Sequence, residues 1–118
     1  FLPNHYHIIV KIAVAANLSK FIGSFHGKSS YLANQYDNVK NRKIWHQYWD
    51  SCIRQENDLY TRLNYIHQNP VKHKFSKEMQ SYNWSSYKTW ENKMGKNGMH
   101  DLFEKYPIID FTLKEDMK

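Results

Sequence analysis

The sequence predicts an α+β domain in which an antiparallel sheet carries helices on one side. Two segments, 1–12 and 43–50, have the β-branched and aromatic content that is typical of strands. Two others, 17–36 and 56–69, repeat apolar residues three or four positions apart, as helices do. The chain has 118 residues, which gives one compact domain a usable core. We therefore expect a single domain over residues 1–118.

The composition indicates a folded and basic protein. Hydrophobic residues make up 41% of the chain and aromatic residues 16%, which argues against disorder. Seventeen lysines and arginines exceed eleven acidic residues and give a net charge of +6, and nine tyrosines and four tryptophans accompany them. Such a surface suits a phosphate backbone and stacked bases, although positive charge also serves solubility alone.

The cysteine content and the lengths of the apolar runs indicate in which cellular compartment the protein is expected. Cys52 is the one cysteine in the sequence, so no disulfide can form within the chain, and a reducing cytoplasm is expected. No apolar run reaches the length of a membrane span and no signal peptide is visible. We expect a cytoplasmic protein without a membrane partner.

The first predicted strand, Phe1 to about Ile12, carries two histidines. Alternate side chains of an extended segment share a face, so His5 and His7 emerge together while Tyr6 turns away. Two imidazoles can begin a metal site, but such a site needs a third protein group and keeps open positions for water or substrate. Hydrogen-bonded core histidines are the alternative.

A helix and a second strand follow. The helix runs to about Tyr36, and its polar face either meets phosphates or is simply solvated. The strand Lys43–Asp50 places Trp45 and Trp49 on one face. The apolar stripe of the helix is Leu18, Phe21, Ile22, Phe25, Tyr31 and Leu32, and its polar face is Lys20, His26, Lys28, Ser29 and Ser30.

A second helix starts near Glu56. We expect Pro70 to end it, because proline lacks the N–H that the helix needs and disfavours helical geometry in the residue before it. Tyr65 and Asn69 are four apart, so they share one helix face. The proline leaves the geometry of Asn69 open, and the neighbouring Gln68 and His67 stay alternatives as a third metal ligand. The apolar stripe is Leu59, Leu63 and Ile66.

These motifs resemble those of a known family. The run Pro-Asn-His-Tyr-His at positions 3–7, followed by aliphatic residues, resembles the signature of the single-tyrosine HUH transposases. Tyr-Ile-His-Gln-Asn-Pro-Val-Lys at 65–72 resembles their nucleophile helix. The nearest branch is the REP-associated tyrosine transposases, within the IS200-like group. The resemblance runs from about residue 2 to 87, includes Ile-Trp at 44–45 and Trp-Ser-Ser-Tyr at 84–87, and leaves 88–118 as a C-terminal tail.

The resemblance implies a fold and a chemistry. The fold is the ferredoxin-like (RRM-like) HUH domain. Tyr65 would be the nucleophile, and His5, His7 and Asn69 would hold a divalent metal. An amide ligand beside phosphate suits Mg²⁺ or Mn²⁺ better than Zn²⁺. The expected reaction is metal-dependent cleavage of single-stranded DNA, with strand transfer through a 5′-phosphotyrosine.

The resemblance also implies binding partners, and two alternative functions remain open. Expected partners are single-stranded or hairpin DNA and a second copy in a homodimer. Relatives carry an earlier strand and helix, so either this sequence is a fragment or those elements are dispensable, and their absence would expose a sheet edge. The enzyme rival is a rolling-circle or relaxase-type nickase. The other rival is an inactive or truncated module that binds hairpin DNA. The candidate DNA contacts are Lys28, Arg42, Arg54, Arg62, Lys72 and Lys74.

Overall fold

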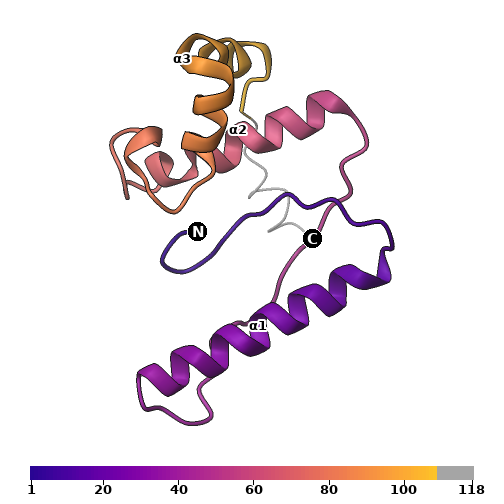
Figure 1. The fold of residues 1–118 in the computed structure, drawn as a ribbon, viewed down its shortest axis with the longest axis vertical. Helices are drawn as coiled ribbons and strands as arrows, with labels where there is room; N and C mark the ends of the chain where they lie inside the picture. The colour runs from indigo at the N-terminus through magenta and orange to yellow at the C-terminus, as the bar shows by residue number, and fades with distance from the viewer. Residues whose placement is uncertain (109–118) are drawn as a thin grey trace. The chain divides into compact units, whose positions relative to one another are not determined.

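The computed structural model describes residues 1–108, and its regular structure is helical. The elements are α1 (Ala16–Tyr36), α2 (Glu56–Lys72), the short 3-10 helix η1 (Met79–Ser81) and α3 (Tyr87–Lys105) (Figure 1). Gly95 interrupts α3 with a φ of 75°. The chain forms two compact units, one of residues 1–9 with 51–118 and one of residues 10–50. Within residues 1–108 no helix is long and apolar enough to cross a bilayer.

The predicted antiparallel sheet is wrong, and with it the α+β, ferredoxin-like fold. Residues 1–108 contain no strand, and the segments 1–12 and 43–50 are irregular. β-branched and aromatic residues suit a pleated surface, but a strand also needs a neighbour to accept its hydrogen bonds, and neither segment has one. Side chains hold the first segment instead. The Tyr82 hydroxyl donates to the Phe1 carbonyl, and the Phe1 ring stacks on Tyr6 at 5.2 Å between centroids.

The unit of residues 10–50 is α1 and the segment that returns along it. The Trp45 indole stacks on His26 with 4.6 Å between ring centroids, and its Nε1–H donates to Ser29 Oγ at 2.8 Å. Arg42 closes the turn after the helix through Asp37, with 2.8 Å between Nη2 and Oδ2. Side-chain contacts therefore fix the segment that the sequence predicted as a strand.

The other unit is built on α2, which packs against α3 and η1. Its apolar core consists of Leu63, Tyr65, Tyr87, Met99 and Leu102. Asn64, which is fully buried, joins the two long helices, because its Nδ2 donates to the carbonyls of Leu102 at 3.1 Å and Tyr106 at 3.0 Å. The last carbonyls of a helix have no partner within the helix. The Leu102 carbonyl also accepts from the Tyr106 N–H at 3.0 Å, so Asn64 adds a second donor to that carbonyl and one donor to the carbonyl of Tyr106.

The prediction that Pro70 ends α2 is also wrong, since the helix continues to Lys72. The residues after the proline form a Schellman cap. Lys74 has a left-handed φ of 63° and donates its N–H to the Val71 carbonyl at 3.0 Å, and the Phe75 N–H donates to the Pro70 carbonyl at 2.9 Å. The proline gives up one helical hydrogen bond close to the end of the helix, and the cap closes the turn beyond it. Asn69 is consequently helical.

The two bonds of Asn64 give a stability prediction. Replacing Asn64 by leucine keeps the bulk but leaves the Leu102 and Tyr106 carbonyls without this donor, so the free energy of unfolding should fall by about 2–4 kcal/mol. Gln68→Leu is the control on the same helix, because Gln68 is exposed, and it should change stability by less than about 0.5 kcal/mol. Urea unfolding followed by circular dichroism measures both. Equal stability of the two variants would contradict the bridging role of Asn64.

Candidate functional site

The C-terminal half of α2 meets the N-terminal segment and gathers the predicted site residues. Tyr65 and Asn69 lie one turn apart on α2. The His7 ring meets the Tyr65 ring edge-on at 5.5 Å between centroids, and His5 meets His7 at 5.2 Å. His5 Nε2 lies 3.3 Å from Asn69 Oδ1. The two histidines are thus neighbours in space of two α2 side chains that follow some sixty positions later in the sequence.

Of the three residues considered for the third ligand, Asn69 is the one placed beside a histidine. Gln68 is exposed. His67 is fully buried and engaged elsewhere, with 2.8 Å from its Nε2 to Ser86 Oγ and its ring edge-on to Tyr87. The continuation of α2 past Pro70 is what brings the Asn69 amide to His5.

The His5 ring can take either tautomer in this site. Its Nδ1 lies 2.6 Å from Asn4 Oδ1, and its Nε2 lies 3.3 Å from Asn69 Oδ1. When Nδ1 donates to Asn4, Nε2 keeps a lone pair that can bind a cation, and when Nε2 carries the proton it donates to Asn69. Asn69 Nδ2 is buried and has no hydrogen-bond partner among the described residues.

The donor set fits a divalent cation. Burial lowers the pKa of His7 to about 4 and also lowers the pKa of His5, so both imidazoles are neutral at pH 7, as metal ligands must be. Ligand atoms about 2.1 Å from an octahedral Mg²⁺ lie about 3 Å apart, close to the separation of Nε2 and Oδ1. Within residues 1–108 no three His, Cys, Asp or Glu side chains converge on a metal site. The Asn69 amide would therefore be the third protein donor beside the two imidazoles.

Two further side chains at the end of α2 contact the site, and the sequence analysis gave neither of them a role there. The Lys72 ammonium lies 5.6 Å from the centroid of the Tyr65 ring. The His73 ring meets His5 edge-on at 5.4 Å between centroids. The signal was in the spacing, because positions seven and eight beyond Tyr65 fall on its face of a helix. The expected helix end at Pro70 hid it.

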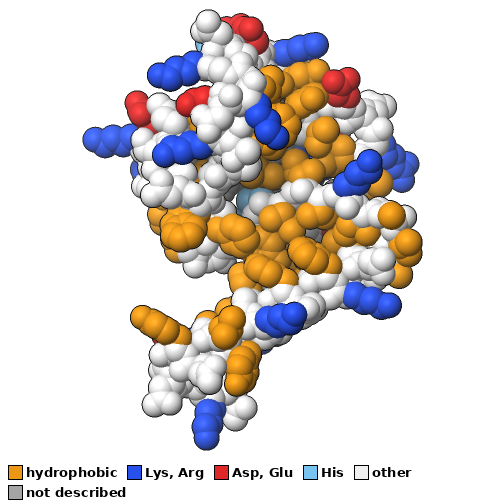
Figure 2. All heavy atoms as spheres, in the orientation of Figure 1, with side chains coloured by type: hydrophobic (Ala, Val, Ile, Leu, Met, Phe, Trp, Pro, Cys, Tyr) orange, Lys and Arg blue, Asp and Glu red, His pale blue; other side chains and the backbone are white. Residues whose placement is uncertain are grey.

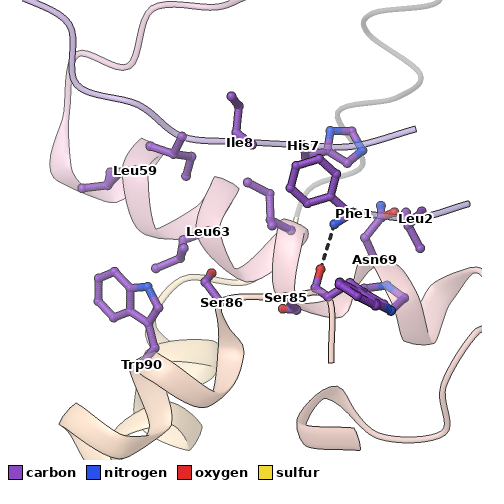
Figure 3. Close-up of a pocket in the computed structure, with 14 residues that line it drawn as sticks. Phe1, Leu2, His7, Ile8, Leu59, Leu63, Asn69, Ser85, Ser86 and Trp90 are labelled. Atoms are coloured by element: carbon purple, nitrogen blue, oxygen red, sulfur yellow. Dashed lines mark hydrogen bonds between the residues drawn. The ribbon is translucent and has the colours of Figure 1, made fainter. Parts of the chain in front are cut away.

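An apolar cavity of about 460 Å³ adjoins the site (Figure 3). His7 and Asn69 belong to its wall, and in the close-up Leu59 and Leu63 of α2 and Trp90 of α3 point toward the same space. Trp84, also in the wall, is 71% exposed. The apolar wall limits water on one side of His7, which is consistent with the lowered pKa of its ring.

The predicted DNA contacts differ in their surroundings. Arg42 is paired with Asp37 at 2.8 Å and Arg62 with Asp58 at 3.1 Å. Lys28 and Arg42 belong to the unit of residues 10–50, whereas the remaining candidates, Arg54, Arg62, Lys72 and Lys74, belong to the other unit. Lysine and arginine side chains are seen as separate blue groups in the view of Figure 2.

Comparison with known proteins gave a family and a relative. The model of the family described as "Transposase IS200 like" matches residues 1–69. A candidate REP-associated tyrosine transposase of Haemophilus influenzae is 25% identical over 96 residues, which are 73% of this chain and 54% of the relative. The chain thus spans about half the length of that relative. No solved structure matches.

The burial of His67 predicts how stability depends on pH. Burial lowers the pKa of its ring to about 4 from an ordinary 6.5. Between pH 4 and pH 6.5 the imidazole is therefore protonated in the unfolded chain but neutral in the folded protein. The free energy of unfolding is therefore not reduced by this histidine above pH 6.5. It falls by at most about 3 kcal/mol as the pH is lowered from 6.5 to 4, because protonation of His67 favours the unfolded chain. His67→Gln should flatten the unfolding free energy over this range in denaturant titrations. The exposed His46→Gln should follow the wild type, and a parallel curve for His67→Gln would refute the assignment.

Proposed function

The chain belongs to the IS200-like transposase family, and from this premise we propose that it cleaves single-stranded DNA and transfers the strand through Tyr65. Transposases process DNA, and the family therefore supports a DNA-processing enzyme. The specific reaction proposed is metal-dependent attack on a phosphodiester that leaves a 5′-phosphotyrosine. Its substrate would be single-stranded DNA or the unpaired strand beside a hairpin, because an unpaired strand is flexible and leaves its bases free to stack on aromatic side chains.

One observation carries the proposal. Tyr65, whose ring lies 5.5 Å from that of His7, shares a helix face with Asn69, whose Oδ1 lies 3.3 Å from His5 Nε2. A phenol, two neutral imidazoles and an amide oxygen thereby meet at one end of α2. This combination offers a nucleophile and donors for one divalent cation, which is what phosphoryl transfer requires.

The reaction balances without an added energy source. The Tyr65 oxygen forms a bond to phosphorus as the bond from phosphorus to the 3′ oxygen breaks. The electron pair leaves with the 3′ oxygen, which takes up a proton, and the phenol gives its proton to solvent. The covalent product is again a phosphodiester, now between the DNA and the tyrosine. Attack on it by a different 3′-hydroxyl therefore reverses the reaction and joins a new strand.

Each residue of the candidate site has a separate role in this proposal. His5, His7 and Asn69 would hold Mg²⁺ or Mn²⁺, which when bound draws charge from the phosphate. In that arrangement His5 Nδ1–H would donate to Asn4 Oδ1, which leaves the lone pair of Nε2 for the metal. The His7 ring packs against Tyr65 and thereby orients the phenol. A free phenol has a pKa of about 10 and attacks poorly at neutral pH, so positive charge near the phosphate is needed.

The test is a covalent adduct. Wild-type protein mixed with single-stranded DNA and Mg²⁺ or Mn²⁺ should give a protein–DNA complex that survives denaturing electrophoresis. Tyr65→Phe removes the attacking oxygen but keeps the ring, so the adduct should vanish while DNA binding and stability change by less than about 1 kcal/mol. Tyr60→Phe is the matched control on the same helix and should still form the adduct.

His7→Ala and added chelator should each abolish the adduct, whereas the exposed His46→Ala should not. An adduct that persists in Tyr65→Phe would move the nucleophile to another tyrosine and refute the assignment. If the wild type binds DNA but forms no adduct, the alternative of a binding-only module replaces the enzyme.

A further inference from the structure

We propose that Lys72 is a catalytic residue whose ammonium contacts the phosphate that Tyr65 attacks. The inference rests on the proposed function of Tyr65 and adds a residue to that site. It gives Lys72 a role different from that of Lys74, which stands two positions further on as a general contact to the DNA backbone.

The placement of Lys72 follows from the geometry of α2. Seven residues make two turns of an α-helix, so the side chain of Lys72 lies over the face that carries Tyr65. Its ammonium is 5.6 Å from the centroid of the Tyr65 ring, within the range of a cation–π contact. Lys72 is itself the last residue of the helix, and the cap formed by Lys74 and Phe75 keeps that residue helical.

The difference in exposure of the two partners points to the phosphate. Tyr65 is 5% exposed, whereas Lys72 is exposed. A phosphodiester bonded to the Tyr65 oxygen would therefore lie close to the ammonium, which is 5.6 Å from the ring centroid. Phosphate competes strongly with an aromatic face for an ammonium, because a full negative charge replaces a partial one. The ammonium would move from the ring to the entering phosphate over a short distance.

The charge acts where the reaction creates charge. As the Tyr65 oxygen bonds to phosphorus and the 3′ oxygen departs, negative charge gathers on the non-bridging oxygens. An ammonium placed there before reaction stabilises the transition state more than the ground state. Lys72 neither gives nor takes a proton in this scheme, so the balance of the reaction is unchanged.

Two simpler roles would leave the chemistry untouched. A lysine in the last turn of a helix stabilises the helix dipole, and any lysine beside a DNA path adds affinity. The first role would appear as a lower melting temperature, and the second as weaker binding. Neither would slow cleavage by correctly folded protein that is saturated with DNA.

The experiment separates rate from affinity. Adduct formation is followed in single turnover, with protein in excess and at saturating concentration, for Lys72→Met, Lys72→Gln, Lys72→Arg and Lys77→Met. We expect Lys72→Met and Lys72→Gln to form the adduct roughly a hundredfold more slowly with a modest change in Kd, and Lys72→Arg to recover most of the rate. Lys77 is exposed, and Lys77→Met should react at the wild-type rate. Melting temperatures check the folding of each variant.

A DNA strand with one uncharged methylphosphonate tests which phosphate Lys72 contacts. In the non-cleaving Tyr65→Phe background, a single methylphosphonate at the mapped cleavage position should weaken binding, and adding Lys72→Gln should remove that penalty but not the penalty at flanking positions. Wild-type rates in both neutral Lys72 variants, equal slowing by Lys77→Met, or an unchanged methylphosphonate penalty would overturn the role of Lys72. If the wild type forms no adduct at all, the proposed function fails and this inference falls with it.

Discussion

The continuation of α2 through Pro70 is the constraint on which the candidate site depends. Had the helix ended at the proline, the Asn69 side chain would have left the face of Tyr65 and the end of the helix would not reach Lys72. The helix continues because Lys74 accepts a left-handed conformation and the Pro70 carbonyl finds a donor in Phe75. The cost of a proline is smallest near a helix end, where one lost hydrogen bond leaves most of the ladder intact.

Burial then sets the electrostatics of the site. The imidazole of His7 loses solvation beside the apolar cavity, which lowers its pKa, and burial also lowers the pKa of His5. The same site holds Asn69 Oδ1 3.3 Å from His5 Nε2 and leaves Asn69 Nδ2 without a hydrogen-bond partner among the described residues. An unpaired buried polar group costs about 1–3 kcal/mol. Stability alone therefore does not explain the position of the Asn69 amide.

The sequence predicted α1 and α2 but not α3, and it predicted two strands that residues 1–108 lack, for a physical reason. A helix closes its hydrogen bonds within one segment, so the apolar spacing near Leu18 and Leu63 was sufficient to find α1 and α2. A strand closes its hydrogen bonds with another segment, and the residues of 1–12 and 43–50 say nothing about whether such a neighbour exists. The end of α2 was missed because local rules for proline omit the cap that follows it.

The proximity of the candidate site residues was easier to predict than the fold, since it depends on motifs and not on a sheet. His5, His7, Tyr65 and Asn69 were named from their spacing and from the family resemblance, and they lie together although the sheet expected to carry the histidines is absent from residues 1–108. Lys72 was named for its charge alone. Its contact with Tyr65 could not be predicted while the helix was thought to end at Pro70.

The buried position of Tyr65 connects the irregular N-terminal segment to the proposed chemistry. At 5% exposure the phenol cannot meet a phosphodiester until something above it moves. The groups found against its ring are the His7 ring and the Lys72 ammonium. A lysine side chain changes rotamer at small cost, and residues 5–9 can shift without breaking a strand ladder. Tyr65 itself stays fixed by α2, so access to the nucleophile requires rearrangement only of the parts that are cheapest to move.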